Sequence, residues 1–196
     1  MRSFRNILAL IAAAIALDAE VAWASPVHYR IDTMHTYTSF EAPHIEAISF
    51  WRGKFDRTKG GEIVLDRAAK TGTVEVTIDA SSVDLGLEKL NEHVKSKDFL
   101  DVASFPTATY KGAIQFTGDT PTSVKGELTL HGVTKPVTLA IRSLKCITDP
   151  MLGVERCGAD VTAQIDRGDF GVNYGIPMTG SDVRLQIQVE GLVETR

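Results

Sequence analysis

Apolar and polar residues alternate one by one along most of this 196-residue chain. In residues 73–79, single polar residues separate Val74, Val76 and Ile78, and residues 182–190 repeat the pattern. Successive side chains of a β-strand point to opposite faces, so a period of two predicts strands with one buried face and one solvated face. We therefore expect an all-β fold.

Short segments rich in glycine, proline and aspartate separate the alternating runs. They lie at residues 59–62, 117–122, 131–136 and 148–153. Such segments predict turns, and short turns join antiparallel neighbours. We expect about eight to ten strands, arranged as a sandwich or as an up-and-down barrel. An eight-stranded barrel is either filled by side chains or holds one small ligand, and the alternation alone does not choose between the two.

Residues 85–106 break the alternation. Leu87, Leu90 and Val94 recur at helical spacing, with charged residues between them, and Pro106 ends the segment. This predicts one amphipathic helix followed by a short turn at residues 98–102. The insertion would either serve as a lid over a barrel mouth or simply cap the barrel end.

The first 24 residues have the composition of a secretory signal peptide. Arg2 and Arg5 precede an apolar run at residues 7–17, which is too short to span a bilayer as a helix. Small residues at Ala22 and Ala24 suit a signal peptidase, with cleavage near Ala24–Ser25. We expect residues 1–24 to be removed and residues 25–196 to form the mature domain; the alternative is an N-terminal membrane anchor.

The chain has two cysteines, Cys146 and Cys157, on either side of the predicted turn at residues 148–153. Cysteines of exported proteins usually pair, and neighbours across a hairpin lie within disulfide reach. We therefore predict a disulfide; the alternative is two free buried thiols. No histidine or acid stands beside them at zinc-ligand spacing.

Composition and motifs argue against several functions. The formal net charge is −4, and the basic residues are scattered singly, which speaks against a nucleic-acid partner. The chain contains no G-x-S-x-G elbow and no H-E-x-x-H helix. We therefore predict a protein that is not an enzyme and that needs no cofactor and no metal.

His44 has the same strand parity as Phe40 and Ala42, which directs its ring inward. It is either a core histidine, hydrogen-bonded to a backbone group or to a neighbour such as Asp32, or a polar contact inside a pocket. The glycine-rich run at residues 167–175 lacks the signature of a P-loop, so we expect a kinked strand end with bulges at Gly168 and Gly171. Arg167 could meet an anionic head group at a barrel mouth.

Aromatic residues on apolar faces are the strongest candidates for a binding site. Small residues such as Ala42, Gly112 and Gly126 share these faces and would leave volume for an apolar ligand. The predicted ligand-binding residues are Phe40, His44, Phe50, Phe55, Val76, Ile78, Phe99, Phe105, Tyr110, Phe116, Leu128, Arg167 and Phe170.

Five segments together resemble the YceI-like proteins. They read YRIDTMHTYTSFEAPHI at residues 29–45, RGKF at 52–55, HVKSKDFLDVASFPTATY at 93–110, GELTLHGVTKPVTL at 126–139 and CGADVTAQIDRGDFGV at 157–172. The sequence departs from the family pattern at Thr36, where the family usually has serine. The resemblance implies an eight-stranded antiparallel barrel of lipocalin-like shape with a helical insertion, exported to the periplasm. It also implies binding of long apolar chains, such as polyisoprenoids or fatty-acid-like amphiphiles, without catalysis.

The leading hypothesis is a periplasmic carrier whose partner is an isoprenoid or acyl lipid. One alternative is an enzyme that acts on such a lipid through His35 or His44 with Asp32. Another is a solid barrel with a role in stress or in protein interaction. A homodimer and a transient contact with an inner-membrane protein are further partners that we consider.

Overall fold

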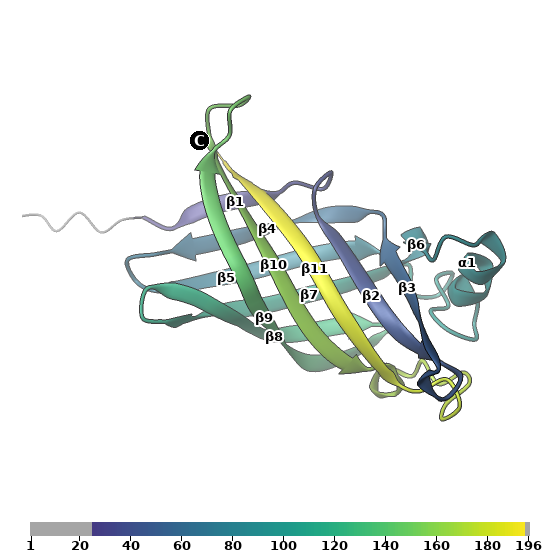
Figure 1. The fold of residues 1–196 in the computed structure, drawn as a ribbon. Helices are drawn as coiled ribbons and strands as arrows, with labels where there is room; N and C mark the ends of the chain where they lie inside the picture. The colour runs from purple at the N-terminus through teal and green to yellow at the C-terminus, as the bar shows by residue number, and fades with distance from the viewer. Residues whose placement is uncertain (1–24, 195–196) are drawn as a thin grey trace, which may run out of the picture.

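The computed structural model describes residues 25–194, so the predicted signal peptide lies outside the described residues. The described chain is built almost entirely of strands, with one α-helix and three short 3₁₀ helices (Figure 1). In chain order the elements are β1 Val27–Ile31, β2 Tyr37–His44, η1 Ile45–Ala47, β3 Ser49–Phe55, β4 Thr58–Asp66, β5 Thr71–Asp79, η2 Ala80–Ser82, β6 Val83–Asp84, α1 Glu88–Lys95, β7 Thr107–Thr117, β8 Thr120–Leu130, β9 Val133–Thr148, β10 Glu155–Asp166, η3 Arg167–Phe170 and β11 Asp182–Val193.

Eight of the strands close into an antiparallel barrel. Their order is β1-β4-β5-β7-β8-β9-β10-β11, and β11 pairs with β1 to complete the circle. From β4 to β11 the barrel strands follow one another in sequence order, as in an up-and-down barrel. The predicted eight-stranded antiparallel barrel is therefore confirmed, and the sandwich is not formed.

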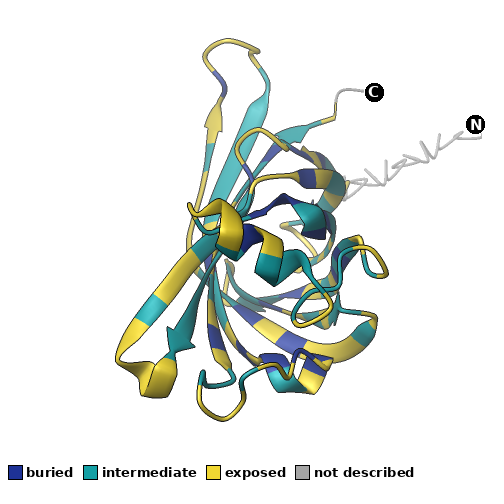
Figure 2. Cartoon of the chain, turned by 90° about the vertical axis from the view of Figure 1, so that its right-hand side faces the viewer, coloured by how far each residue is buried: buried dark blue, intermediate teal, exposed yellow. Residues whose placement is uncertain are grey.

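The two ends of the barrel differ because β11 has two partners on one side. Its C-terminal part pairs with β1, whereas residues 184–188 pair with β2. Beyond β2 the sheet continues through β3 to the short strand β6. The helix α1 follows β6 and lies across this wider end, where Figure 2 views it from the front. Among residues 25–194, no helix is both long and apolar enough to cross a bilayer.

One predicted turn is wrong. Residues 59–62 are not a turn, because β4 runs through them and the break between β3 and β4 lies at residues 56–57. Gly60 and Gly61 have positive φ angles of 135° and 154°, and the register of β4 on β5 shifts between Thr58 and Gly60. A Cβ atom at Gly61 would lie 2.1 Å from the main-chain oxygen of Glu75. The two glycines therefore permit a β-bulge at a close approach of two strands.

The run after β10 is a 3₁₀ helix rather than the predicted kinked strand end with bulges. The Asp166 carboxylate accepts a hydrogen bond from the Gly168 amide at the start of η3. Gly171 ends η3 in the left-handed conformation, with a φ of 78°. A side-chain cap before a turn and a left-handed glycine after it stabilise helical rather than extended backbone.

The hairpin between β9 and β10 confirms the predicted disulfide. Cys146 and Cys157 are directly opposite each other in the β9–β10 register, and their sulfur atoms are bonded. The predicted turn at residues 148–153 lies in the connection between these two strands.

Candidate functional site

Two apolar cavities adjoin inside the barrel. The inner cavity, inside the closed part, has a volume of about 150 Å³. The outer cavity, beneath α1, has a volume of about 360 Å³. Thr38, Ile78, Leu128 and Leu185 line both cavities, so the two spaces meet along one apolar interior.

The inner cavity presents almost only carbon to a ligand. Val74, Val76 and Ile78 line it from β5, as their alternation predicted. Two of its three threonines already use their hydroxyls: Thr58 Oγ1 donates to the main-chain oxygen of Thr36 at 3.0 Å, and Thr36 Oγ1 donates to the main-chain oxygen of Glu190. A guest in this space would gain burial of apolar surface and little hydrogen bonding.

Tyr110 is one of the two tyrosines that line the inner cavity, and its hydroxyl is also hydrogen-bonded. Its one proton is shared between the main-chain oxygens of Val137 at 2.9 Å and Val124 at 3.1 Å. The ring lies over Gly126, where a Cβ atom would come within 2.8 Å of Tyr110 Cζ. Burial raises the pKa of Tyr110 to about 12, so the phenol stays neutral and remains a donor to these carbonyls.

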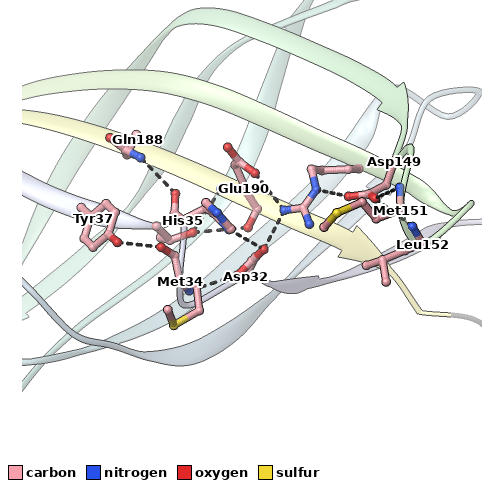
Figure 3. Close-up of polar contacts among 11 residues, drawn as sticks. Asp32, Met34, His35, Tyr37, Asp149, Met151, Leu152, Gln188 and Glu190 are labelled. Carbon is pink, nitrogen blue, oxygen red and sulfur yellow. Dashed lines mark hydrogen bonds and ion pairs between the residues drawn. The ribbon is translucent and has the colours of Figure 1, made fainter.

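A cluster of charged residues holds the narrow end of the barrel together (Figure 3). Arg156 donates through Nη1 to Asp32 at 2.6 Å and to Glu190 at 2.8 Å, and through Nε to Asp149 at 2.7 Å. These carboxylates come from the loop after β1, from β11 and from the β9–β10 hairpin. Burial of Asp32 opposes ionisation, but hydrogen bonds from Arg156 and His35 lower its pKa to about 2.

The structure brings His35 and Asp32 of the enzyme hypothesis together and separates His44 from both. His35 Nδ1 lies 2.9 Å from Asp32 Oδ2 on the outside of this charged cluster. His44 is at the far end of β2, and a strand of that length separates the two histidines by on the order of 25 Å. His44 therefore does not share a site with Asp32 and His35.

His44 lines the outer cavity, on the face that strand parity predicted. Its ring meets Trp51 edge to face, with 5.5 Å between the ring centroids. The alternative of a hydrogen bond to Asp32 is not realised, because Asp32 contacts His35 and Arg156.

The helical insertion supplies one wall of the outer cavity. Leu90 and Val94, on the apolar face of α1, line it together with Phe99 from the following turn. Phe40 and Phe55 line it from β2 and β3, with their ring centroids 5.8 Å apart.

Arg167 also lines the outer cavity, but its guanidinium is largely committed to the chain itself. It is 7% exposed, and it donates to the main-chain oxygens of Val172 at 2.6 Å, Tyr174 at 2.9 Å and Gly180 at 2.9 Å. Burial lowers its pKa. Arg167 therefore organises the loop of residues 171–181, a use that competes with the predicted contact to an anionic head group.

Nine of the thirteen predicted ligand-binding residues line the two cavities, and four lie elsewhere. The nine are Phe40, His44, Phe55, Val76, Ile78, Phe99, Tyr110, Leu128 and Arg167. Phe50 lies under the Arg184 guanidinium, and Phe105 packs on the His131 ring. Phe116 packs on the core beyond a register shift in β7, and Phe170 is buried in η3.

Sequence reasoning missed several lining residues. The helical spacing of Leu90 and Val94 was a usable signal, because the apolar face of a surface helix points inward. Trp51 has the parity of Phe55 on β3 and could have been included. Tyr174 comes from an irregular loop, where neither the helical spacing nor the strand alternation predicts which way a side chain points.

Comparison with known proteins agrees with this architecture. A UPF0312 protein of Vibrio vulnificus is 33% identical over 187 residues, which are 93% of this chain and 97% of that protein. The crystal structure of Burkholderia cenocepacia BcnA has a TM-score of 0.68 at 23% identity, covering 82% of this chain and 98% of that one. A polyisoprenoid binding domain from Saccharophagus degradans has a TM-score of 0.61 at 16% identity, covering 85% and 98%.

The model of the YceI-like domain family matches residues 29–191, from β1, the first strand of the barrel, to β11, its last. The matched range includes every strand that lines the two cavities and the whole helical insertion. This chain belongs to the YceI-like family.

Proposed function

We propose that this protein binds one long-chain apolar lipid, a polyisoprenoid or a fatty-acid-like amphiphile, in the joined cavities of its barrel. The observation that carries the proposal is an interior whose walls are almost entirely carbon and in which the hydroxyls of Tyr110, Thr36 and Thr58 are already hydrogen-bonded. Burial contributes about 0.8 kcal/mol per CH₂ group, so a long chain can bind tightly with few polar contacts. The Saccharophagus degradans domain, which shares this fold, is described as polyisoprenoid binding.

The protein would act as a carrier in the periplasm rather than as a catalyst. Export would depend on residues 1–24, with cleavage near Ala24–Ser25. The cavities are lined by hydrocarbon, and the acid–base groups Asp32 and His35 lie outside them. Homodimerisation and contact with an inner-membrane protein stay predictions.

The solid-barrel alternative has less support. A filled barrel would leave no space inside, whereas the two cavities here measure about 150 and 360 Å³. Empty apolar space of this size is destabilising unless a guest fills it.

Uptake by delipidated protein tests the proposal. Leu128→Trp adds bulk where the two cavities meet, whereas Glu127→Trp places the same ring on the exposed outer face of β8. We expect native mass spectrometry to detect one polyisoprenol or long-chain fatty acid on the wild type and on Glu127→Trp. Leu128→Trp should reduce that occupancy at least tenfold.

Equal uptake by Leu128→Trp, or no uptake by the wild type, would overturn the binding site. The lipid recovered from these samples should have its original mass. A changed mass that depends on His44 would support the enzyme hypothesis instead.

A further inference from the structure

The outer cavity reaches the surface at two aromatic residues. Trp51 and Tyr174 both line the cavity, yet they are 38% and 48% exposed. They come from β3 and from the loop of residues 171–181. Their rings therefore mark a mouth where the apolar interior meets solvent.

Two loops beside this mouth carry exposed aliphatic side chains. Ile45 and Ile48 lie between β2 and β3, and Ile176 and Met178 lie in the loop before β11. The loops touch, because the Glu46 amide donates to the Met178 carbonyl at 2.7 Å. Figure 1 draws them together at the lower right. We call the surface formed by Ile45, Ile48, Trp51, Tyr174, Ile176 and Met178 the mouth patch.

The mouth patch is almost free of charge. Residues 171–181 contain no charged side chain, and residues 45–51 contain only Glu46, in a chain that is 23% charged. Solitary exposed apolar residues are ordinary on protein surfaces, whereas a contiguous group of this kind marks an interaction site. The composition therefore favours an apolar partner over a charged one.

The chemistry of the patch fits a bilayer surface. Tryptophan and tyrosine have apolar rings with one polar atom, and they are enriched where proteins meet the membrane interface. Isoleucine and methionine at the loop tips can enter the acyl boundary without burying charge. The patch is also continuous with the hydrocarbon wall of the outer cavity, so a lipid chain leaving a bilayer there would not cross water.

We propose that the mouth patch docks on the surface of a phospholipid bilayer and that the lipid enters and leaves the barrel through it. The passage of lipid rests on the function proposed above. The docking does not, since the exposed loops carry it alone.

Co-flotation with vesicles tests the docking. The probe is a vesicle of phosphatidylethanolamine and phosphatidylglycerol, mixed with protein purified after export. The double variant Ile48→Glu/Met178→Glu adds charge to two residues that are 78% and 56% exposed. The matched control Met151→Glu changes a residue that is 87% exposed at the β9–β10 hairpin, at the opposite end of the barrel. Unfolding temperatures should agree among the three proteins.

We expect the double variant to lose at least tenfold in the fraction that floats with vesicles, and Met151→Glu to match the wild type. Once residues 1–24 are removed, Trp51 is the only tryptophan, so its fluorescence should shift to the blue on docking. Failure of the wild type to float, or equal flotation of the double variant, would overturn the docking. If the wild type does not float but forms a dimer that the double variant abolishes, the mouth patch is an interface between two copies of the chain. That result would also overturn the docking on a bilayer.

The two proposals fail separately. Flotation of a protein that takes up no lipid would refute the binding function and leave the docking. Lipid uptake by a protein that never floats would refute the docking and leave the binding function.

Discussion

Three polar side chains of the barrel interior, those of Tyr110, Thr36 and Thr58, are hydrogen-bonded to the main chain of the barrel. Tyr110 is 5% exposed, and its hydroxyl joins the carbonyls of Val124 and Val137. The hydroxyls of Thr36 and Thr58 make similar bonds to the main chain. Because these three hydroxyls bond to the main chain, they offer no free hydrogen-bonding group to a ligand, and the cavity stays apolar.

Replacing Tyr110 by phenylalanine tests this account at the level of one hydroxyl. The change leaves two buried carbonyl oxygens without this donor, and we expect a loss of about 1 kcal/mol in the free energy of unfolding. Tyr37→Phe is the control, because its hydroxyl donates to the Met34 carbonyl at an exposed position. Urea denaturation measures both variants. Equal stability of Tyr110→Phe and the wild type would contradict a structural role for the hydroxyl.

Among the structural elements, the regular strands were predictable from the sequence and the irregular segments were not. Strand parity predicted the inward faces of Val76, Ile78 and His44 because β5 pairs with β7, and β2 with β3, without a register shift in those stretches. Phe116 also packs on the core, but it lies past the register shift of β7 on β8 and does not line either cavity. Gly60 and Gly61 resemble a turn in sequence, but the close approach of β5 uses them within a strand. Such bulges depend on the neighbouring strand, which a local pattern does not contain.

The Arg156 cluster joins three elements at the narrow end, and its stability should depend on pH. Asp32 has an ordinary pKa near 3.8 and a folded pKa of about 2. Because the folded value is lower, its contribution of about 2 kcal/mol is present at neutral pH and is lost as the pH falls from about 5 to 2. No local sequence pattern predicts this cluster, since its members lie far apart along the chain.

Arg156→Met should destabilise the protein at pH 7 by on the order of 2 kcal/mol, because Asp32, Asp149 and Glu190 lose their shared cation. It should also flatten the fall in stability between about pH 5 and pH 2. Arg142→Met is the control, since Arg142 donates to the exposed Thr162 hydroxyl on the same strand pair. Denaturation curves at several pH values report both effects. If Arg156→Met lost as much stability between pH 5 and pH 2 as the wild type does, the Arg156 cluster would not be the cause of the acid sensitivity.

As a whole, the molecule is a barrel with one cross-linked end and one wide end. The disulfide and the Arg156 cluster fasten the end at the β9–β10 hairpin. At the other end α1 and the loop of residues 171–181 enclose the outer cavity. The sequence predicted the closed barrel and the insertion. The contribution of the loop of residues 171–181 to the mouth was not predicted, because Arg167 rather than a repeating pattern holds this loop in place.

The central claim is that the joined cavities hold a lipid in the cell. The most direct measurement is native mass spectrometry of protein purified from its own export route, together with mass spectrometry of its organic-solvent extract. We predict one isoprenoid or acyl lipid per chain, present in the extract and lost from the protein after delipidation. A bare polypeptide mass with no lipid in the extract would contradict the claim and favour an interaction role for the barrel.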